Sequence, residues 1–85
     1  MKMLMLLSLF TSVAMSCGED TYRCVSPGST VGEDWRHTKA CMDKLEIVED
    51  CYCIHRAETY AVAGNRAEDF KNCCNDFPNY YWREC

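Results

Sequence analysis

Eight cysteines constrain this 85-residue chain more than any other feature. All of them stand within residues 17–85: Cys17, Cys24, Cys41, Cys51, Cys53, Cys73, Cys74 and Cys85. A chain of this size buries too little apolar surface to offset its conformational entropy comfortably, so a covalent framework is expected. Four disulfides at about 2–4 kcal/mol each would rival the whole net stability of such a domain. We therefore expect full reduction to leave the chain largely unfolded.

The N-terminus carries the pattern of an export signal. Lys2 precedes the apolar run Met3–Phe10, and Ala14-Met15-Ser16 places small residues where a signal peptidase reads. The run is shorter than the roughly 20 apolar residues that a membrane span needs. We predict a signal peptide over residues 1–16, with cleavage after Ala14 as the alternative, and one secreted, extracellular, cysteine-rich domain over residues 17–85. An even number of cysteines behind such a signal predicts disulfides.

The charge of the predicted mature chain is negative. Removing Lys2 leaves eight lysines and arginines against thirteen acidic residues, a formal charge of −5. Nucleic acids and anionic membranes need clustered positive charge, and no such cluster is present in the sequence. We therefore expect no nucleic-acid partner and no membrane span, and we expect a monomer.

The longest helical pattern follows a capping box. Thr30 and Glu33 stand three residues apart, as the N-cap and N3 residues of a helix do, and a start with Asp34 as the N-cap fits equally well. Apolar positions then recur at steps of three or four through Cys41 and Leu45 as far as Tyr52. Because one uninterrupted helix to Ala63 would be about 45 Å long, we expect a break near residues 51–53.

The rest of the chain predicts a mainly α architecture. Residues 54–63 are expected to form a second helix that ends at Gly64, and residues 65–77 a third helix that Pro78 terminates. Pro27-Gly28 is a turn signal in a looped N-terminal arm, with a short extended segment at residues 22–25. The predicted fold is a small disulfide-stapled bundle of about three short helices, with an irregular aromatic tail from residue 79.

Eight cysteines allow 105 pairings, and spacing removes some of them. Cys73 and Cys74 are adjacent, so each is expected to bridge to a different element. Cys51 and Cys53 are too close to bond to each other. We expect Cys41 to bridge to one of these sets, and Cys17 and Cys24 to fasten the N-terminal arm to the helical body. The full connectivity stays open.

The sequence predicts no metal site, cofactor or catalytic group. The close cysteine pairs are Cys-x-Cys and Cys-Cys, whereas zinc sites usually show Cys-x-x-Cys, and oxidised sulfurs bind no metal. A cysteine nucleophile needs a free thiolate, and no Gly-x-Ser-x-Gly motif is present. His37 and His55 stand among charged residues, where solvated histidines are expected. The paired carboxylates, such as Glu33-Asp34 and Glu68-Asp69, are explained by helix starts and surface charge.

One stretch has the composition of a binding surface. Residues 77–83, Phe-Pro-Asn-Tyr-Tyr-Trp-Arg, combine the side chains that dominate binding hot spots. We expect Phe77 and Trp82 to serve the core. Tyr80, Tyr81 and Arg83 are the candidate partner surface, and the role of Trp35 is left open between core and surface.

The predicted signal peptide and the cysteine spacing together resemble the small cysteine-rich secreted proteins of plant-associated fungi, the candidate-effector class. The resemblance spans the mature chain. The residues that carry it are Cys17-Gly18, Thr38-Lys39-Ala40-Cys41-Met42, Cys51-Tyr52-Cys53, Cys73-Cys74 and Arg83-Glu84-Cys85. It implies a non-enzymatic virulence protein that binds an extracellular protein target of a host, and it transfers no functional residues.

Two other classes fit the same sequence. A venom toxin or a pheromone would be the same physical object, directed at an animal receptor or channel. A small lipid or ligand carrier would need an apolar cavity between its helices, and the large aromatic side chains of this chain are expected to fill that space.

Overall fold

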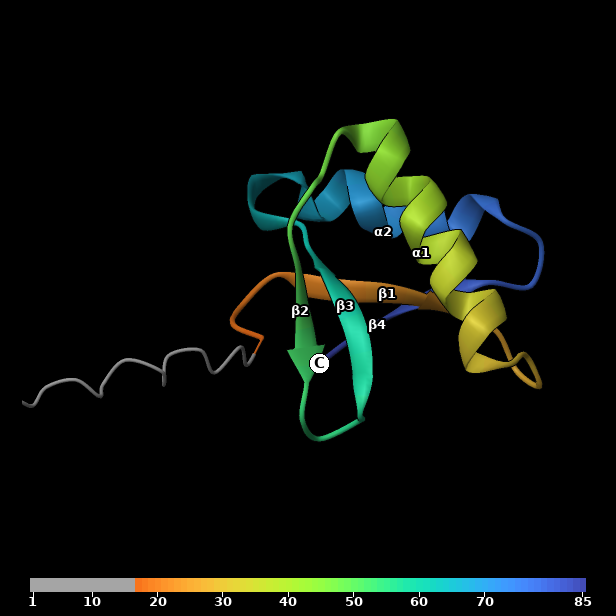
Figure 1. The fold of residues 1–85 in the computed structure, drawn as a ribbon. Coiled ribbons are helices and arrows are strands. Elements are labelled where there is room, and N and C mark those ends of the chain that lie inside the picture. Colours follow the sequence, from red (N-terminus) through yellow and green to blue (C-terminus); the bar gives the residue numbers. More distant parts are fainter. Residues whose placement is uncertain (1–16) are drawn as a thin grey trace, which may run out of the picture.

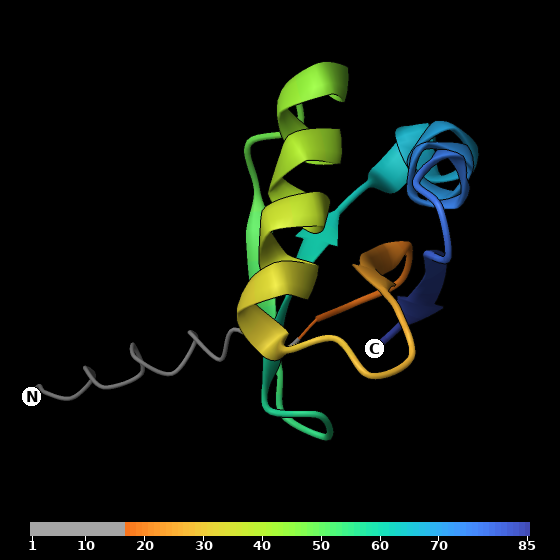
Figure 2. The same ribbon diagram turned by 90° about the vertical axis from the view of Figure 1, so that its right-hand side faces the viewer.

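The computed structural model describes residues 17–85, so the predicted signal peptide lies outside the described residues. In chain order the elements are β1 (Thr21–Val25), α1 (Val31–Leu45), β2 (Asp50–Cys53), β3 (Glu58–Val62), the short 3₁₀ helix η2 (Gly64–Arg66), α2 (Ala67–Asp76) and β4 (Tyr81–Glu84). The strands form one antiparallel sheet in the order β2-β3-β1-β4 (Figure 1). Two α-helices pack against this sheet and against each other, and Figure 2 shows α2 nearly end-on beside α1. The predicted three-helix bundle is therefore wrong.

Helix α1 begins where the capping box places it and ends earlier than predicted. The backbone N–H of Glu33 donates to Thr30 Oγ1 at 3.1 Å, and the N–H of Thr30 donates to Glu33 Oε1 at 3.0 Å, which selects the capping box over the alternative start at Asp34. At the other end Glu46 adopts a left-handed conformation with φ of 61°, and the N–H of Ile47 donates to the carbonyl of Met42 at 2.8 Å. This is a Schellman arrangement, and Ile47 joins Met42 in the core behind it.

Residues 54–63, predicted as a second helix, form the turn and the second strand of a β-hairpin. Residues 54–57 form the turn, and β3 pairs with β2 through Cys51 opposite Tyr60 and Tyr52 opposite Thr59. Aromatic and β-branched residues favour such a pleated, half-buried surface. The expected irregular tail is also a strand, β4, paired with β1. Helix α2 lies within the predicted third helix, and its C-cap Phe77 is extended ahead of Pro78 as expected.

All eight cysteines are paired, in the bridges Cys17–Cys51, Cys24–Cys74, Cys41–Cys73 and Cys53–Cys85. Adjacent Cys73 and Cys74 bridge to different elements, α1 and β1, as predicted from their spacing. Cys41 bonds within that set, as expected. The expectation that Cys17 fastens the arm to a helix is wrong, because its partner lies on β2. Cys53 on β2 is bonded to Cys85 just beyond β4, so one bridge joins the two edge strands of the sheet.

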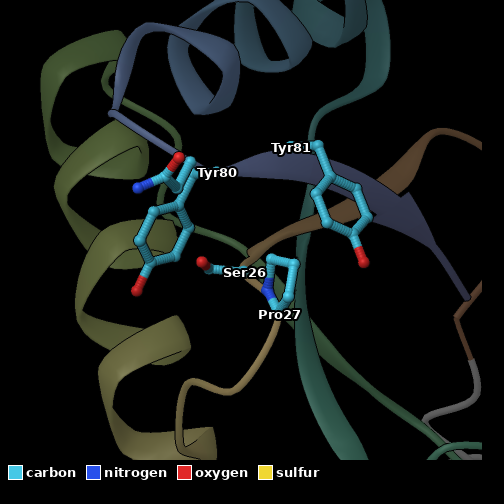
Figure 3. Close-up of a pocket in the computed structure, with 5 residues that line it drawn as sticks. Ser26, Pro27, Tyr80 and Tyr81 are labelled. Carbon is cyan, nitrogen blue, oxygen red and sulfur yellow. The ribbon is translucent and has the colours of Figure 1, made fainter.

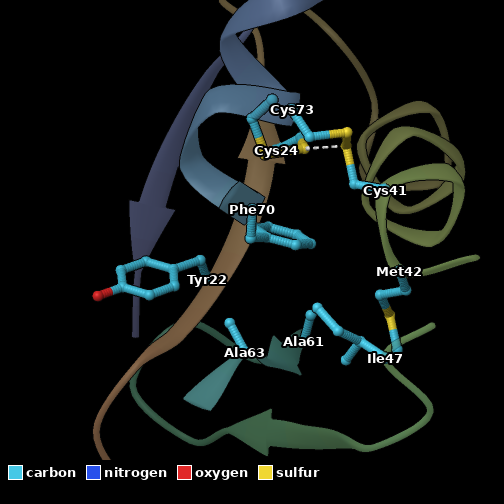
Figure 4. Packing of buried hydrophobic residues seen from close by; sticks show 10 residues of the cluster. Tyr22, Cys24, Cys41, Met42, Ile47, Ala61, Ala63, Phe70 and Cys73 are labelled. Atoms are coloured by element: carbon cyan, nitrogen blue, oxygen red, sulfur yellow. Dashed lines mark hydrogen bonds between the residues drawn. A yellow bond between two sulfur atoms is a disulfide. The ribbon is translucent and has the colours of Figure 1, made fainter. Parts of the chain in front are cut away.

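The core lies between the helices and β1, with Phe70 fully buried at its centre (Figure 4). Its members are Tyr22, Cys24, Cys41, Met42, Ile47, Ala61, Ala63, Phe70, Cys73 and Cys74. Two disulfides lie side by side in it, with Cys24 Sγ 3.9 Å from Cys41 Sγ. Phe77 and Trp82 pack against the cluster, as does Trp35. The sulfur bridges are thus a large part of the buried apolar volume.

Two buried tyrosines predict a loss of stability at alkaline pH. Burial raises the pKa of Tyr60 above the usual 10.0, and the negative charge of Glu58 adds to this. Burial likewise raises the pKa of Tyr22, against the opposing charge of Lys71. Well below pH 10 both tyrosines are protonated in the folded and in the unfolded chain. Their contribution to the free energy of unfolding is then fully present. As pH rises beyond 10 the unfolded chain ionises first, so the free energy of unfolding falls. Melting temperatures measured from pH 8 upward should decline above pH 10.

Tyr60→Phe is the matched variant for this effect. The Tyr60 hydroxyl is buried without a hydrogen-bond partner in the described structure, so its removal should cost little at neutral pH. The variant should show a shallower alkaline decline than the wild type. An unchanged decline would assign the pH dependence to other groups.

Candidate functional site

Tyr80 and Tyr81 line an open hollow of about 540 Å³, which we call the tyrosine slot. Its lining residues are Ser26, Pro27, Asn79, Tyr80 and Tyr81. Figure 3 shows the two tyrosine rings on either side of Ser26 and Pro27. None of the five residues carries a charge, so the slot offers hydroxyl and amide groups beside two aromatic rings.

Two proline-containing turns build the slot. Ser26–Ser29 turns with Pro27 at the first central position and Gly28 at φ of 80°, closed by a bond of 3.2 Å from the Ser29 N–H to the Ser26 carbonyl. This confirms the predicted Pro27-Gly28 turn. Residues 77–80 repeat the pattern, with Pro78 followed by Asn79 at φ of 67° and a closing bond of 3.1 Å. Proline followed by a positive-φ residue is the pattern of a type II turn, which fixes the backbone.

Strand pairing brings the two turns together. Val25, the last residue of β1, lies opposite Tyr81, the first residue of β4. The turn that leaves β1 and the turn that enters β4 therefore emerge at the same end of the sheet. Neither turn alone would make a hollow, so the slot depends on this antiparallel register.

Tyr80 is held against α1 by a stack of rings. The rings of His37 and Tyr80 are stacked, with centroids 4.0 Å apart and planes 23° apart, and Phe77 meets the His37 ring edge-on at 4.6 Å. The His37 ring is itself anchored, because Nδ1 lies 2.8 Å from the Glu33 carbonyl. One face of the Tyr80 ring is thus covered by His37, and the ring lines the slot in a fixed position. His37 supports this side chain, a role the sequence did not indicate.

Tyr81 and Arg83, the other two residues of the predicted partner surface, lie in different parts of the structure. Tyr81 is 41% exposed and lines the slot beside Tyr80. Arg83 lies further along β4, half-buried, opposite Arg23 of β1, and does not line the slot. The structure therefore brings Tyr80 and Tyr81 together and leaves Arg83 apart from them.

A second feature, which the sequence did not reveal, is a buried arginine in the sheet. Strands β1 and β3 pair only at Thr21 with Val62 and at Tyr22 with Ala61. Beyond that point Arg23 reaches from β1 to the backbone of β3, and it is 1% exposed. Burial of an arginine requires partners for its charge and its donors.

Arg23 finds these partners on α1 and β3. Nη1 donates to the Thr59 carbonyl at 3.0 Å and Nη2 to the Val31 carbonyl at 3.3 Å. Asp34 Oδ2 lies 3.8 Å from Nη2, and Glu58 Oε1 lies 3.4 Å from Nε as an ion pair without hydrogen-bond geometry. The guanidinium therefore connects the first turn of α1 to the β2–β3 hairpin.

An opening of about 300 Å³ lies over this arginine, and we call it the Arg23 cleft. It is lined by Arg23, Val31, Gly32, Trp35, Tyr52, Ala57, Glu58 and Thr59. Val31 and Tyr52 are among the few large apolar side chains that are strongly exposed. Trp35, whose role the sequence left open, both packs on the core and lines this cleft.

Within residues 17–85, residues of metal-ligating type come together at one place. One group of three potential ligand residues is close enough to share an ion, namely Cys24, Cys41 and Cys74, whose sulfurs lie within 4.8 Å of one another. All three sulfurs are in disulfides and have no thiolate to offer. His55 is exposed on the hairpin turn. Over the same residues, no helix is long and apolar enough to cross a membrane.

Comparison with known proteins found no matching family model, no matching curated protein and no matching solved structure. The candidate site therefore stands on the geometry of the tyrosine slot and of the Arg23 cleft. The protein is small and compact, of α+β architecture with four disulfides, and secreted cysteine-rich proteins are built in this way.

Proposed function

We propose that the protein is secreted and acts without catalysis, by binding an extracellular protein of a host in the manner of a small cysteine-rich effector. The observation that carries the proposal is the tyrosine slot, in which Tyr80 and Tyr81 are presented together at the surface. Tyrosine combines a large apolar ring with a polar tip and is enriched in binding hot spots.

Preorganisation supports a binding role for this slot. Both turns that build it contain proline, and the ring of His37 holds Tyr80 in place. A surface that is already ordered loses little side-chain entropy on association, so more of the contact energy appears as affinity. The Cys24–Cys74 bridge adjoins this region through β1 and restrains its scaffold.

The test begins with the full chain expressed in a secreting eukaryotic host. We expect the medium to contain a product that begins at Cys17 and has all eight cysteines oxidised, which mass spectrometry checks. The labelled product is then applied to intact plant tissue and to cultured animal cells. We expect saturable binding to the plant tissue that unlabelled protein displaces.

The double variant Tyr80→Ala/Tyr81→Ala should lose at least about tenfold in affinity, the effect of removing a hot spot. Ile54→Ala is the matched control, because Ile54 is 67% exposed on the hairpin turn and lies outside the slot. Equal loss in both variants, or no loss in the double variant, would remove the slot from the proposal. Saturable binding to animal cells alone would favour the toxin or pheromone class, and no saturable binding to either would contradict a host-binding role.

A further inference from the structure

We propose that the Arg23 cleft binds a lysine or arginine side chain of a protein partner. This goes beyond the proposed function, because the cleft and the tyrosine slot share no lining residue. The inference rests on the Glu58 carboxylate at the cleft, on the aromatic lining and on the size of the opening.

One carboxylate lines the cleft, that of Glu58. Arg23 and Glu58 are the charged lining residues, Asp34 pairs with Arg23 from α1 without lining the cleft, and Arg83 lies opposite Arg23 on β4. Glu58 Oε1 faces Arg23 Nε and is buried, while the Glu58 side chain remains 21% exposed. Oε2 is therefore the oxygen left for a ligand. A carboxylate oriented in this way by a fixed guanidinium can accept charge-assisted hydrogen bonds from a second cation.

The lining of the cleft also suits a cation. Trp35 and Tyr52 both line it, and the faces of tryptophan and tyrosine attract ammonium and guanidinium groups. Val31, exposed at the rim, offers an apolar contact for the methylene stem that lysine and arginine carry. A volume of about 300 Å³ is at the small end of ligand pockets, which suits one long side chain.

The alternative occupant of the cleft is an anionic ligand. Helix α1 begins at the cleft, and helix N-termini attract anions. In this helix the first turn already holds two carboxylates, Glu33 and Asp34. Glu33 bonds back to the N-cap, and Asp34 pairs with Arg23. The positive end of α1 and the charge of Arg23 are thus both neutralised from within. The formal charge of −5 on residues 17–85 further favours the approach of cationic partners.

The test uses four blocked tripeptides as probes, Ac-Gly-Lys-Gly-NH₂ and its norleucine, trimethyllysine and glutamate counterparts. They are titrated into the ¹⁵N-labelled, fully oxidised protein, and nuclear magnetic resonance follows the Trp35 indole N–H and the amides of Tyr52 and Glu58. We expect the lysine probe to give saturable shifts at these positions with a Kd of about 1–10 mM, the range of single-side-chain contacts. The norleucine probe, which has the same four-carbon chain without the ammonium group, should bind at least about tenfold more weakly. Trimethyllysine should retain binding, because ring faces need no hydrogen-bond donor.

Two variants locate the effect. Tyr52→Ala should raise the Kd of the lysine probe about fivefold, and Glu58→Gln should raise it about tenfold. Tyr81→Ala, in the tyrosine slot, should leave the Kd of this probe unchanged. If Glu58→Gln does not fold, the Tyr52 variant and the norleucine probe still decide. Equal binding of norleucine and lysine, preferential binding of glutamate, or no saturable shift up to about 20 mM would each overturn the inference. None of these outcomes depends on the host-binding assay, so the two proposals fail separately.

Discussion

Replacing Cys24 and Cys74 together by alanine is expected to destabilise the fold by about 6 kcal/mol. The bridge closes a sequence separation of 50 residues, for which loop-closure entropy gives about 4 kcal/mol. Both residues are fully buried in the core, so their removal also leaves a cavity worth about 2 kcal/mol. Chemical unfolding of the purified variant, followed by circular dichroism, measures the change.

Cys17→Ala/Cys51→Ala is the matched control for this variant. Its bridge has a separation of 34 residues, so loop entropy alone predicts a cost only about 0.3 kcal/mol smaller than for Cys24–Cys74. Both of its cysteines are only half-buried and lie outside the core cluster. We expect the two variants to differ by about 2 kcal/mol. Equal costs would mean that the buried sulfurs contribute chain restraint and no packing.

Arg23→Met is expected to cost about 3–5 kcal/mol, as removal of one partner from a buried ionic group does. The methionine would fill part of the volume but would leave the carboxylates of Asp34 and Glu58 without their cation. The carbonyls of Val31 and Thr59 would also lose their donors. The measurement is again the free energy of unfolding of the oxidised protein.

Two further substitutions define what Arg23 does. Arg23→Lys keeps the charge but has fewer donors and no planar fork, so it should recover only part of the loss. Arg36→Met on the exposed surface of α1 should change stability by less than about 0.5 kcal/mol. A cost below about 1 kcal/mol for Arg23→Met would show that the ion pairs and the two carbonyl bonds are not structurally important.

The parts of the fold that could be predicted depend on neighbours in sequence. Thr30 caps Glu33 three residues away, Pro27 and Gly28 turn the chain locally, and Pro78 ends α2 without reference to the rest of the molecule. The adjacent cysteines likewise exclude each other by local geometry. In each case the interaction is complete within a few residues, so residue type and spacing suffice.

The parts that were wrong depend on distant contacts. Residues 54–63 carry apolar side chains at intervals that fit a helix, but β3 is selected because it can pair with both β2 and β1. Glu46 gives no sign that it will adopt the left-handed conformation normally taken by glycine. That conformation is held by the burial of Ile47.

The residues of the candidate site also divide into those that the sequence could predict and those that only distant contacts bring to the site. Tyr80 and Tyr81 were predicted as a surface from residue type alone, and the structure places both in one hollow. The Pro27 side of that hollow could not be predicted, because it is brought there by the register of β1 and β4. In the sequence, nothing distinguishes Arg23 from a solvent-exposed charged residue of an edge strand. Its burial follows from its place on a central strand, beneath the first turn of α1.

The pattern of sulfur bridges has a consequence for survival among proteases. The hairpin turn at residues 54–57 is exposed and includes Arg56, which offers a cleavage point for trypsin-like enzymes. Three of the four bridges, from Cys24, Cys41 and Cys53, run from the chain before this point to the chain after it. A nick there would yield two fragments that remain fastened at three places, with the tyrosine slot supplied by both. Cleavage at this exposed turn would therefore leave the two fragments covalently joined.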